Sequence, residues 1–292
     1  MRRASTCLAV LGLAALSLPS AASAAPTVKF KFTAIPIPGF PHTGNIKGAG
    51  TAARLEWTIK GSEYDVSPNG EGHPWPVIGV NVYFPKGSKL SPAGFPTCSR
   101  AAVVAKGESV FGTAECPTKS LITFPVKAPQ PDEPGTACTT VLPNESYGLG
   151  VVRFGKEVPC EKARVTGWIA PGGKLEFMAD GVTPALFEEI SVGTVTGSGS
   201  APRTTTVVPL IETVKGAAFA STEKILVNAG AAIKKGKKTI YYGTVPKTCP
   251  KGGFPVKSEV IFAENGEVMP GTRTATKPVA VTASYKAPCP RK

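Results

Sequence analysis

Residues Pro76–Pro117 read PVIGVNVYFPKGSKLSPAGFPTCSRAAVVAKGESVFGTAECP, and this stretch decides the fold. Its first part, Val77–Phe84, is rich in the β-branched and aromatic residues that are typical of a buried strand. Pro85–Gly87 follows as a turn signal. Cys98 and Cys116 come next, placed so that a disulfide would tie this turn to the chain that follows it. The stretch therefore predicts a β-rich fold with stapled loops.

The same β signal recurs along the rest of the chain. In the clearest case Ala53, Leu55, Trp57 and Ile59 alternate with polar residues, the period of two that half-buried strands show. The 32 glycines and 29 prolines favour short strands joined by turns over long helices. Further strands are predicted at Thr27–Thr33, Ala102–Ala105, Ser109–Thr113, Leu121–Val126, Tyr147–Phe154, Ala163–Ala170, Lys174–Met178, Leu186–Val195, Thr204–Val214, Val256–Ala263 and Ala275–Lys286. We expect an all-β fold, an antiparallel β-sandwich of Ig-like or jelly-roll-like type with one or two packed subdomains.

The segment Ala218–Lys238 fits two structures. Ile225, Ala229 and Ile233 recur at helical spacing, and alanine is the best helix former. Gly236, however, precedes the β-rich run Thr239–Tyr242, as in a hairpin. We prefer strand–turn–strand here.

The first 24 residues are predicted to be a secretory signal peptide. Arg2 and Arg3 precede the apolar run Cys7–Leu18, and Ala22–Ala24 has the small residues of a cleavage site. The run is shorter than the roughly 20 residues of a membrane helix. We therefore expect a secreted or cell-surface-associated protein without a transmembrane segment.

A domain boundary is predicted at the proline-rich stretch Lys127–Thr136, which is the most linker-like part of the chain. Residues 25–130 are then an N-terminal β-sandwich subdomain, and residues 131–292 are a C-terminal one. Without the signal peptide, the chain is long enough for one large or two small domains.

Disulfides are the expected role of the cysteines that follow the signal peptide, because their number is even and the chain is predicted to be exported. They are Cys98, Cys116, Cys138, Cys160, Cys249 and Cys289. Many connectivities are possible, and we favour the sequential pairs because each encloses one hairpin-like excursion. No pair has the short spacing of a structural zinc site. We expect neither a metal nor a cofactor.

Positive charge gathers toward the C-terminus of a chain whose net charge is +13. From Lys234 onward there are twelve basic residues and three glutamates, a local net of +9. The run KKGKK contains Lys234, Lys235, Lys237 and Lys238, which are candidate ligand contacts. An anionic cell-wall polymer or glycan is the expected partner, and nucleic acid is not, because the chain is predicted to leave the cell. General solubility is the alternative role of this charge.

Catalytic motifs are missing from the sequence. The two histidines, His42 and His73, lie in Pro/Gly-rich loops without a G-x-S-x-G elbow, and we interpret them as surface residues. No phosphate loop or dinucleotide fingerprint is present. A glycosidase would need two carboxyl groups across a cleft. Glu56, Glu63–Asp65 and Glu188–Glu189 are the available candidates for that pair.

Trp75 is the one aromatic residue that we predict to be exposed, because it lies between Pro74 and Pro76 in a loop. Most other aromatics fall on strands, where a core position is expected. Trp75 is therefore a candidate ligand contact.

Two motifs carry a resemblance to a known group. Pro85–Ser99 has the pattern PKG-x-K-L-x-x-x-G-F-P-T-C-S, and KKGKK is followed by PK-x-C-P-K-G-G-F at Pro246–Phe254. This combination resembles a group of uncharacterised secreted β-rich proteins of high-GC Gram-positive bacteria. The resemblance implies export and a β-rich fold, and it implies no activity or functional residues.

The sequence favours a secreted, non-catalytic binding or structural protein that acts outside the cell or at the cell wall. A carbohydrate-active hydrolase with a carboxylate pair is the alternative. A protein-interaction or inhibitor domain is a third hypothesis, and it would require an exposed apolar patch.

Overall fold

The computed structural model is built almost entirely of β-strands, which confirms the predicted all-β class. It describes residues 24–61, 64, 73–104, 116–124, 148–153, 161–181, 187–197, 201–214 and 218–290. None of the helices in these ranges has the length and apolar character that crossing a bilayer requires.

The strands share an antiparallel arrangement and are short to medium in length. In chain order they are β1 (Thr27–Ile35), β2 (Gly50–Lys60), β3 (Val77–Tyr83), β4 (Lys89–Leu90), β5 (Gly148–Arg153), β6 (Glu161–Ile169), β7 (Leu175–Gly181), β8 (Phe187–Thr196), β9 (Arg203–Val207), β10 (Glu212–Val214), β11 (Ala218–Phe219), β12 (Ser221–Ala229), β13 (Ala232–Lys235), β14 (Lys238–Tyr241), β15 (Gly243–Thr244), β16 (Phe254–Ala263) and β17 (Pro278–Ala287). The helical elements are α1 (Arg100–Val104), η2 (Thr118–Ser120), η3 (Pro171–Gly173) and η4 (Glu264–Gly266).

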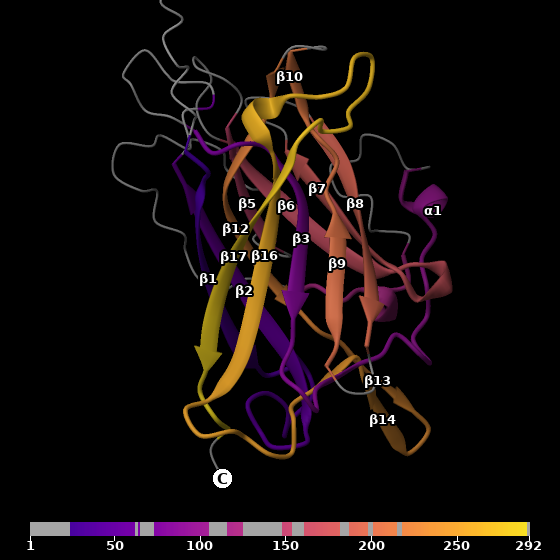
Figure 1. Ribbon diagram of the computed structural model, residues 1–292. Helices are drawn as coiled ribbons and strands as arrows, with labels where there is room; N and C mark the ends of the chain where they lie inside the picture. The colour runs from indigo at the N-terminus through magenta and orange to yellow at the C-terminus, as the bar shows by residue number, and fades with distance from the viewer. Residues whose placement is uncertain are drawn as a thin grey trace, which may run out of the picture.

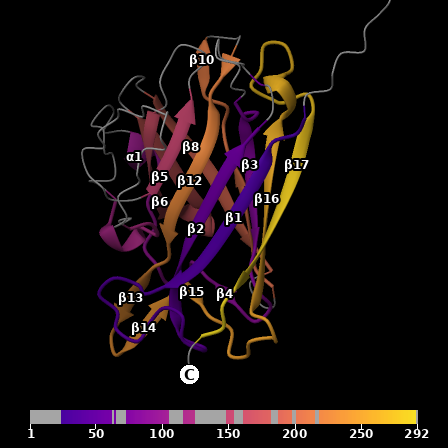
Figure 2. The same ribbon diagram turned by 90° about the vertical axis from the view of Figure 1, so that its left-hand side faces the viewer.

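One 13-stranded sheet folds over on itself to make both layers of a sandwich (Figure 1). The front layer runs β17-β16-β3-β9-β8, and the sheet continues through β7-β6-β5-β12-β2 into the back layer. The path ends in the short strands β15 and β4, and β1 lies off the path and pairs with β2. Figure 2 shows β1 and β17 on the same side of the molecule, and their backbones are in close contact. The edge strand β17 of the front layer therefore lies beside β1 of the back layer.

Strands from both sides of residue 130 are interleaved in this sheet. β3 pairs with β9 and with β16, and β2 pairs with β12. The two predicted subdomains, 25–130 and 131–292, therefore do not form separate sheets. A proline-rich composition indicated a linker, but long-range strand pairing places the strands before and after it in one sheet.

The core lies between the layers, where the alternating strands turn their apolar side chains inward. Phe30 of β1 lies opposite Trp57 of β2, and their rings pack with centroids 5.3 Å apart. The Trp57 indole Nε1 donates a hydrogen bond of 2.7 Å to Oγ of Ser258, a fully buried residue of β16 in the facing layer. Ser258 Oγ in turn donates to the Asn81 carbonyl oxygen at 3.2 Å. These bonds fix the position of one layer against the other.

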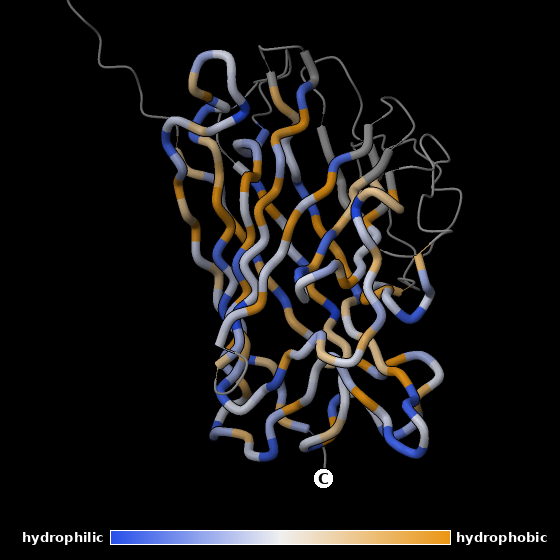
Figure 3. The backbone as a smooth tube through the Cα atoms, turned by 90° about the vertical axis from the view of Figure 1, so that its right-hand side faces the viewer, coloured by the Kyte–Doolittle hydropathy of each residue, from blue (hydrophilic) through white to orange (hydrophobic). Residues whose placement is uncertain are grey.

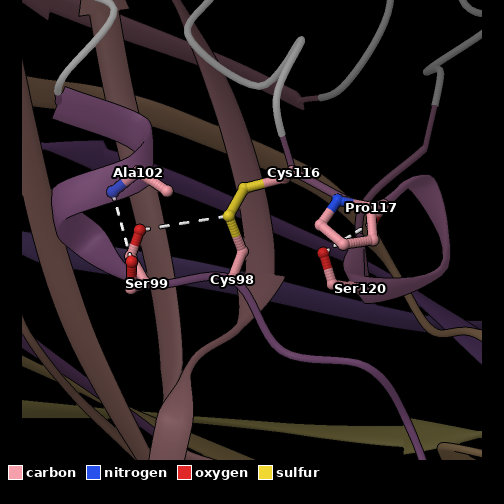
Figure 4. Close-up of a disulfide and its surroundings, with 6 residues drawn as sticks. All are labelled: Cys98, Ser99, Ala102, Cys116, Pro117 and Ser120. Atoms are coloured by element: carbon pink, nitrogen blue, oxygen red, sulfur yellow. Dashed lines mark hydrogen bonds between the residues drawn. A yellow bond between two sulfur atoms is a disulfide. The ribbon is translucent and has the colours of Figure 1, made fainter.

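The predicted strand Ala102–Ala105 is wrong, because the segment begins as the helix α1. Ser99 precedes it, and its Oγ accepts a hydrogen bond of 3.2 Å from the Ala102 amide (Figure 4). A serine in this position satisfies an amide at the start of a helix, and that local bond overrides the β-propensity of the two valines. The predicted strand Ser109–Thr113 lies outside the described residues.

The disulfide Cys98–Cys116 is confirmed and lies beside α1 (Figure 4). Both cysteines are buried, and they pack in one apolar cluster with Trp168 and Met178 on the outer face of the back layer. The disulfide therefore fixes the segment around α1 that covers these side chains.

The pair Cys249–Cys289 is confirmed as well, and it joins the start of β16 to the end of β17. Cys138 and Cys160 lie outside the described residues, so their pairing stays a prediction. Ala218–Lys238 contains the strands β12 and β13, as we preferred, and β13 forms a hairpin with β14.

Candidate functional site

An apolar cavity of about 240 Å³ lies between the two layers. The back layer contributes Ala53, Leu55 and Val227 to its wall, and the front layer contributes Val80 and Val82. Figure 3 shows the apolar segments that recur along the strands and supply such positions. In another protein, an engineered apolar cavity of about 150 Å³ stays dry and binds benzene. This one is large enough for a bigger molecule.

The cavity exists because small side chains occupy inward positions at matching registers. Ala34 of β1 lies opposite Ala53 of β2, and Ala53 lies opposite Ala229 of β12. We call these three residues the alanine row. All three line the cavity and are half-buried. The methyl side chain of an alanine is too short to fill the roughly 10 Å between packed layers, so a space remains next to the alanine row.

The described part of the cavity wall carries no charge. Among the described residues that line it there is no lysine, arginine, histidine, aspartate or glutamate. Its polar atoms come from hydroxyl groups, one asparagine and the backbone. An uncharged apolar molecule loses little solvation here, whereas an ion would be buried without a counter-charge.

Tyr242 lines the cavity next to β14 and β15, and its side chain is only 6% exposed. Its ring packs edge-on against Phe95, with centroids 6.3 Å apart. The hydroxyl has no hydrogen-bond partner among the described residues. Burial raises the pKa of this hydroxyl well above its ordinary value, so it stays a neutral donor.

Tyr242→Phe is expected to stabilise the protein by about 1 kcal/mol or more, because a buried hydroxyl without a partner costs roughly 1–3 kcal/mol. The gain should grow in alkali. The unfolded chain loses this proton near its ordinary pKa of about 10 while the folded protein keeps it, so the stability of the parent falls as the pH rises past that value. Urea unfolding at neutral pH and at about pH 10.5 measures both effects.

Tyr241→Phe, at the half-buried neighbouring position, is the matched control. An identical pH dependence in the parent and in Tyr242→Phe would contradict the prediction.

Trp75 is not exposed, which corrects our expectation. Its side chain is 2% exposed and packs in the same core cluster as Trp57 and Val77. Pro74 and Pro76 belong to the segment that leads directly into β3. The indole between them packs into the core and not into solvent. Trp75 therefore stabilises the core and is not available for a surface ligand.

His73 is buried as well, and only His42 is exposed. His73 forms a backbone bridge with Tyr64, and its Nδ1 lies 3.3 Å from a carboxylate oxygen of Glu223. The interpretation of both histidines as surface residues is therefore wrong for His73.

The candidate carboxylates are engaged with cations where the structure describes them. Glu56 lies 3.8 Å from Lys31. Glu189 and Glu212 lie on either side of Arg273, at 3.0 and 3.5 Å from its guanidinium nitrogens. Glu63, Asp65 and the side chain of Glu188 are outside the described residues.

The basic residues predicted from KKGKK lie together. Lys234, Lys235, Lys237 and Lys238 are all exposed at the turn of the β13–β14 hairpin. The hairpin projects from the lower end of the molecule (Figure 1). The hairpin therefore presents four lysine side chains close together at its turn.

Comparison with protein-family models, with curated proteins and with solved structures gives no match. The resemblance to secreted bacterial proteins stays a prediction. The function must therefore be inferred from the cavity and the hairpin.

Proposed function

We propose that this protein is a secreted, non-catalytic binding protein that holds an apolar small molecule between the layers of its sheet. The cavity of about 240 Å³ with its uncharged wall is the observation that supports this. Ligand sites are mostly apolar clefts or cavities with few polar groups, and this cavity has that character.

The residues that surround the cavity support a binding role over a catalytic one. Imidazole, thiol and carboxylate groups are the usual acids, bases and nucleophiles. No such group belongs to the described lining residues. A carbohydrate hydrolase would require two carboxyl groups at the bound sugar, and we therefore rank it second.

Export is part of the proposal. Disulfides form and persist in oxidising compartments, and two are present in the described chain. The predicted signal peptide over residues 1–24 is consistent with the same destination.

Binding of N-phenyl-1-naphthylamine, a neutral fluorescent probe, tests the function. Fluorescence should rise and saturate when the probe is added to the oxidised protein, and an apolar competitor should reverse the rise. Absence of any saturable signal would contradict the proposal. Extraction of the purified protein with organic solvent, followed by mass spectrometry, would identify a ligand that remains bound.

We further propose that the β13–β14 hairpin contacts an anionic cell-wall polymer or glycan. A variant with Lys234, Lys235, Lys237 and Lys238 changed to serine should lose most of its retention on isolated Gram-positive cell wall at low salt. High salt should release the parent protein too, because exposed charges are screened. Sedimentation with the wall measures both.

The matched control for the hairpin removes four exposed lysines from other places. These are Lys86, Lys89, Lys119 and Lys174. Equal loss of retention in the two variants would show that net charge, and not the hairpin, causes the binding.

A further inference from the structure

Three hydroxyl-bearing side chains line the cavity on neighbouring strands of the sheet. Ser191 belongs to β8, and Thr204 and Thr206 belong to β9. We call these three residues the hydroxyl wall. Residues two apart on a strand share a face, which puts both threonines on the inner face of β9.

The pairing of β8 with β9 brings Ser191 and Thr206 close together, and Thr204 lies two residues before Thr206 on the same face, opposite Val195. Thr206 lies opposite Gly193, and Gly193 is two residues after Ser191 on the same face. Gly193 has no side chain, and a Cβ placed there would lie 3.3 Å from Thr206 Oγ1. The hydroxyl of Thr206 therefore occupies the space above this glycine, next to the position of Ser191.

None of these three hydroxyls forms a hydrogen bond within the described part of the chain, although Ser191 is only 9% exposed. The other described lining residues carry no charge and most are apolar; the polar exceptions are Thr33, Asn45, Thr51, Ser88, Thr222, Tyr242 and Thr244. The oxygens of the hydroxyl wall open into the cavity, so an occupant that excludes water leaves them unpaired, at a cost in free energy, unless it offers a polar atom. Valine in place of threonine, and alanine in place of serine, would fill a similar volume without a polar atom. The hydroxyls therefore indicate a polar group on the molecule that the cavity binds.

We propose that the hydroxyl wall selects an uncharged, mainly apolar ligand that carries a hydroxyl or carbonyl oxygen, such as an alcohol, ketone or ester of lipid type. This rests on the proposed function. Serine and threonine hydroxyls both donate and accept hydrogen bonds, so they fit such an oxygen. A carboxylate or an ammonium group is disfavoured, because none of the described lining residues offers an opposite charge.

Two ligands of nearly the same size test the inference. Butylbenzene is purely apolar, and butyrophenone differs from it by a carbonyl oxygen. Each is titrated as a competitor of N-phenyl-1-naphthylamine, and 4-phenylbutyrate serves as the anionic analogue. The protein variant is Ser191→Ala with Thr204→Val and Thr206→Val, which removes three hydroxyls and keeps the side chains similar in size.

The variant should bind butyrophenone about five- to tenfold more weakly than the parent, which corresponds to the net value of one buried hydrogen bond. Its affinity for butylbenzene should stay within about twofold. The parent should bind 4-phenylbutyrate at least tenfold more weakly than butyrophenone. Thr194→Val, at an exposed position on the outer face of β8, is the control and should change none of these values.

Equal changes for butylbenzene and butyrophenone, or tight binding of 4-phenylbutyrate, would overturn the inference while leaving the proposed function intact. Failure of the parent to bind any of the neutral ligands would instead overturn the proposed function. The single change Thr206→Val replaces the triple variant if the latter does not fold, and the same selective loss, about two- to fivefold, is expected.

Discussion

Ala53→Phe is expected to lower the affinity of the cavity for N-phenyl-1-naphthylamine at least tenfold. Ala53 is the central member of the alanine row, with Ala34 on one side and Ala229 on the other. The substitution adds a ring the size of benzene, a molecule that a cavity of about 150 Å³ in another protein can hold. The ring would therefore occupy a large part of the 240 Å³.

The same substitution should leave the protein as stable as the parent or make it more stable. Overpacking destabilises a filled core, but here the new ring enters existing space and gains contacts. Probe titration and thermal unfolding measure the two effects together. Ala280→Phe, at an exposed position of β17, is the matched control and should retain binding. A folded Ala53→Phe protein with unchanged affinity would place the binding site elsewhere.

Replacement of Cys98 and Cys116 by alanine should lower the free energy of unfolding by about 3 kcal/mol. The disulfide closes a loop with a sequence separation of 18, and the chain-entropy model gives this value for a loop of that size. Loss of packing adds to it, since both cysteines lie in the cluster with Trp168. Urea unfolding of the oxidised proteins measures the difference.

The position of the staple gives a second readout. Trp168 is fully buried under the segment that the disulfide holds, so its emission should shift to longer wavelength in the folded variant. The control, Cys249→Ala with Cys289→Ala, breaks the other staple and should leave this emission unchanged. A loss of stability below about 1 kcal/mol in the first variant would show that the segment is held by packing alone.

The strands were the part of this fold that the sequence could predict. The alternation of apolar and polar residues at Ala53–Ile59 predicts a strand, and β2 confirms it. Local hydrogen bonding explains the error at α1, because Ser99 is an N-cap whose effect a search for alternation does not detect. Trp75 was misplaced for a related reason, since flanking prolines indicate a loop but say nothing about burial.

The cavity could not be predicted, because it depends on which strands become neighbours. Ala34, Ala53 and Ala229 are unremarkable as separate small residues on three strands. They make one row only when β12 pairs with β2, a contact between residues more than 150 positions apart in sequence. The hydroxyl wall likewise needs the register of β8 and β9. By contrast, the basic hairpin is local, and its exposed lysines followed from the run KKGKK itself.

The contact between β1 and β17 governs the order of events in folding. These strands span Thr27–Ile35 and Pro278–Ala287, so the seam between them joins residues about 250 positions apart. It can close only after nearly the whole chain has been synthesised, and contacts of such high order are made slowly. Until the seam closes, the space between the layers has an open side. Under the proposed binding function, a molecule present during that interval would be enclosed by the folding chain itself, and the bound ligand would reflect the surroundings in which the protein folded.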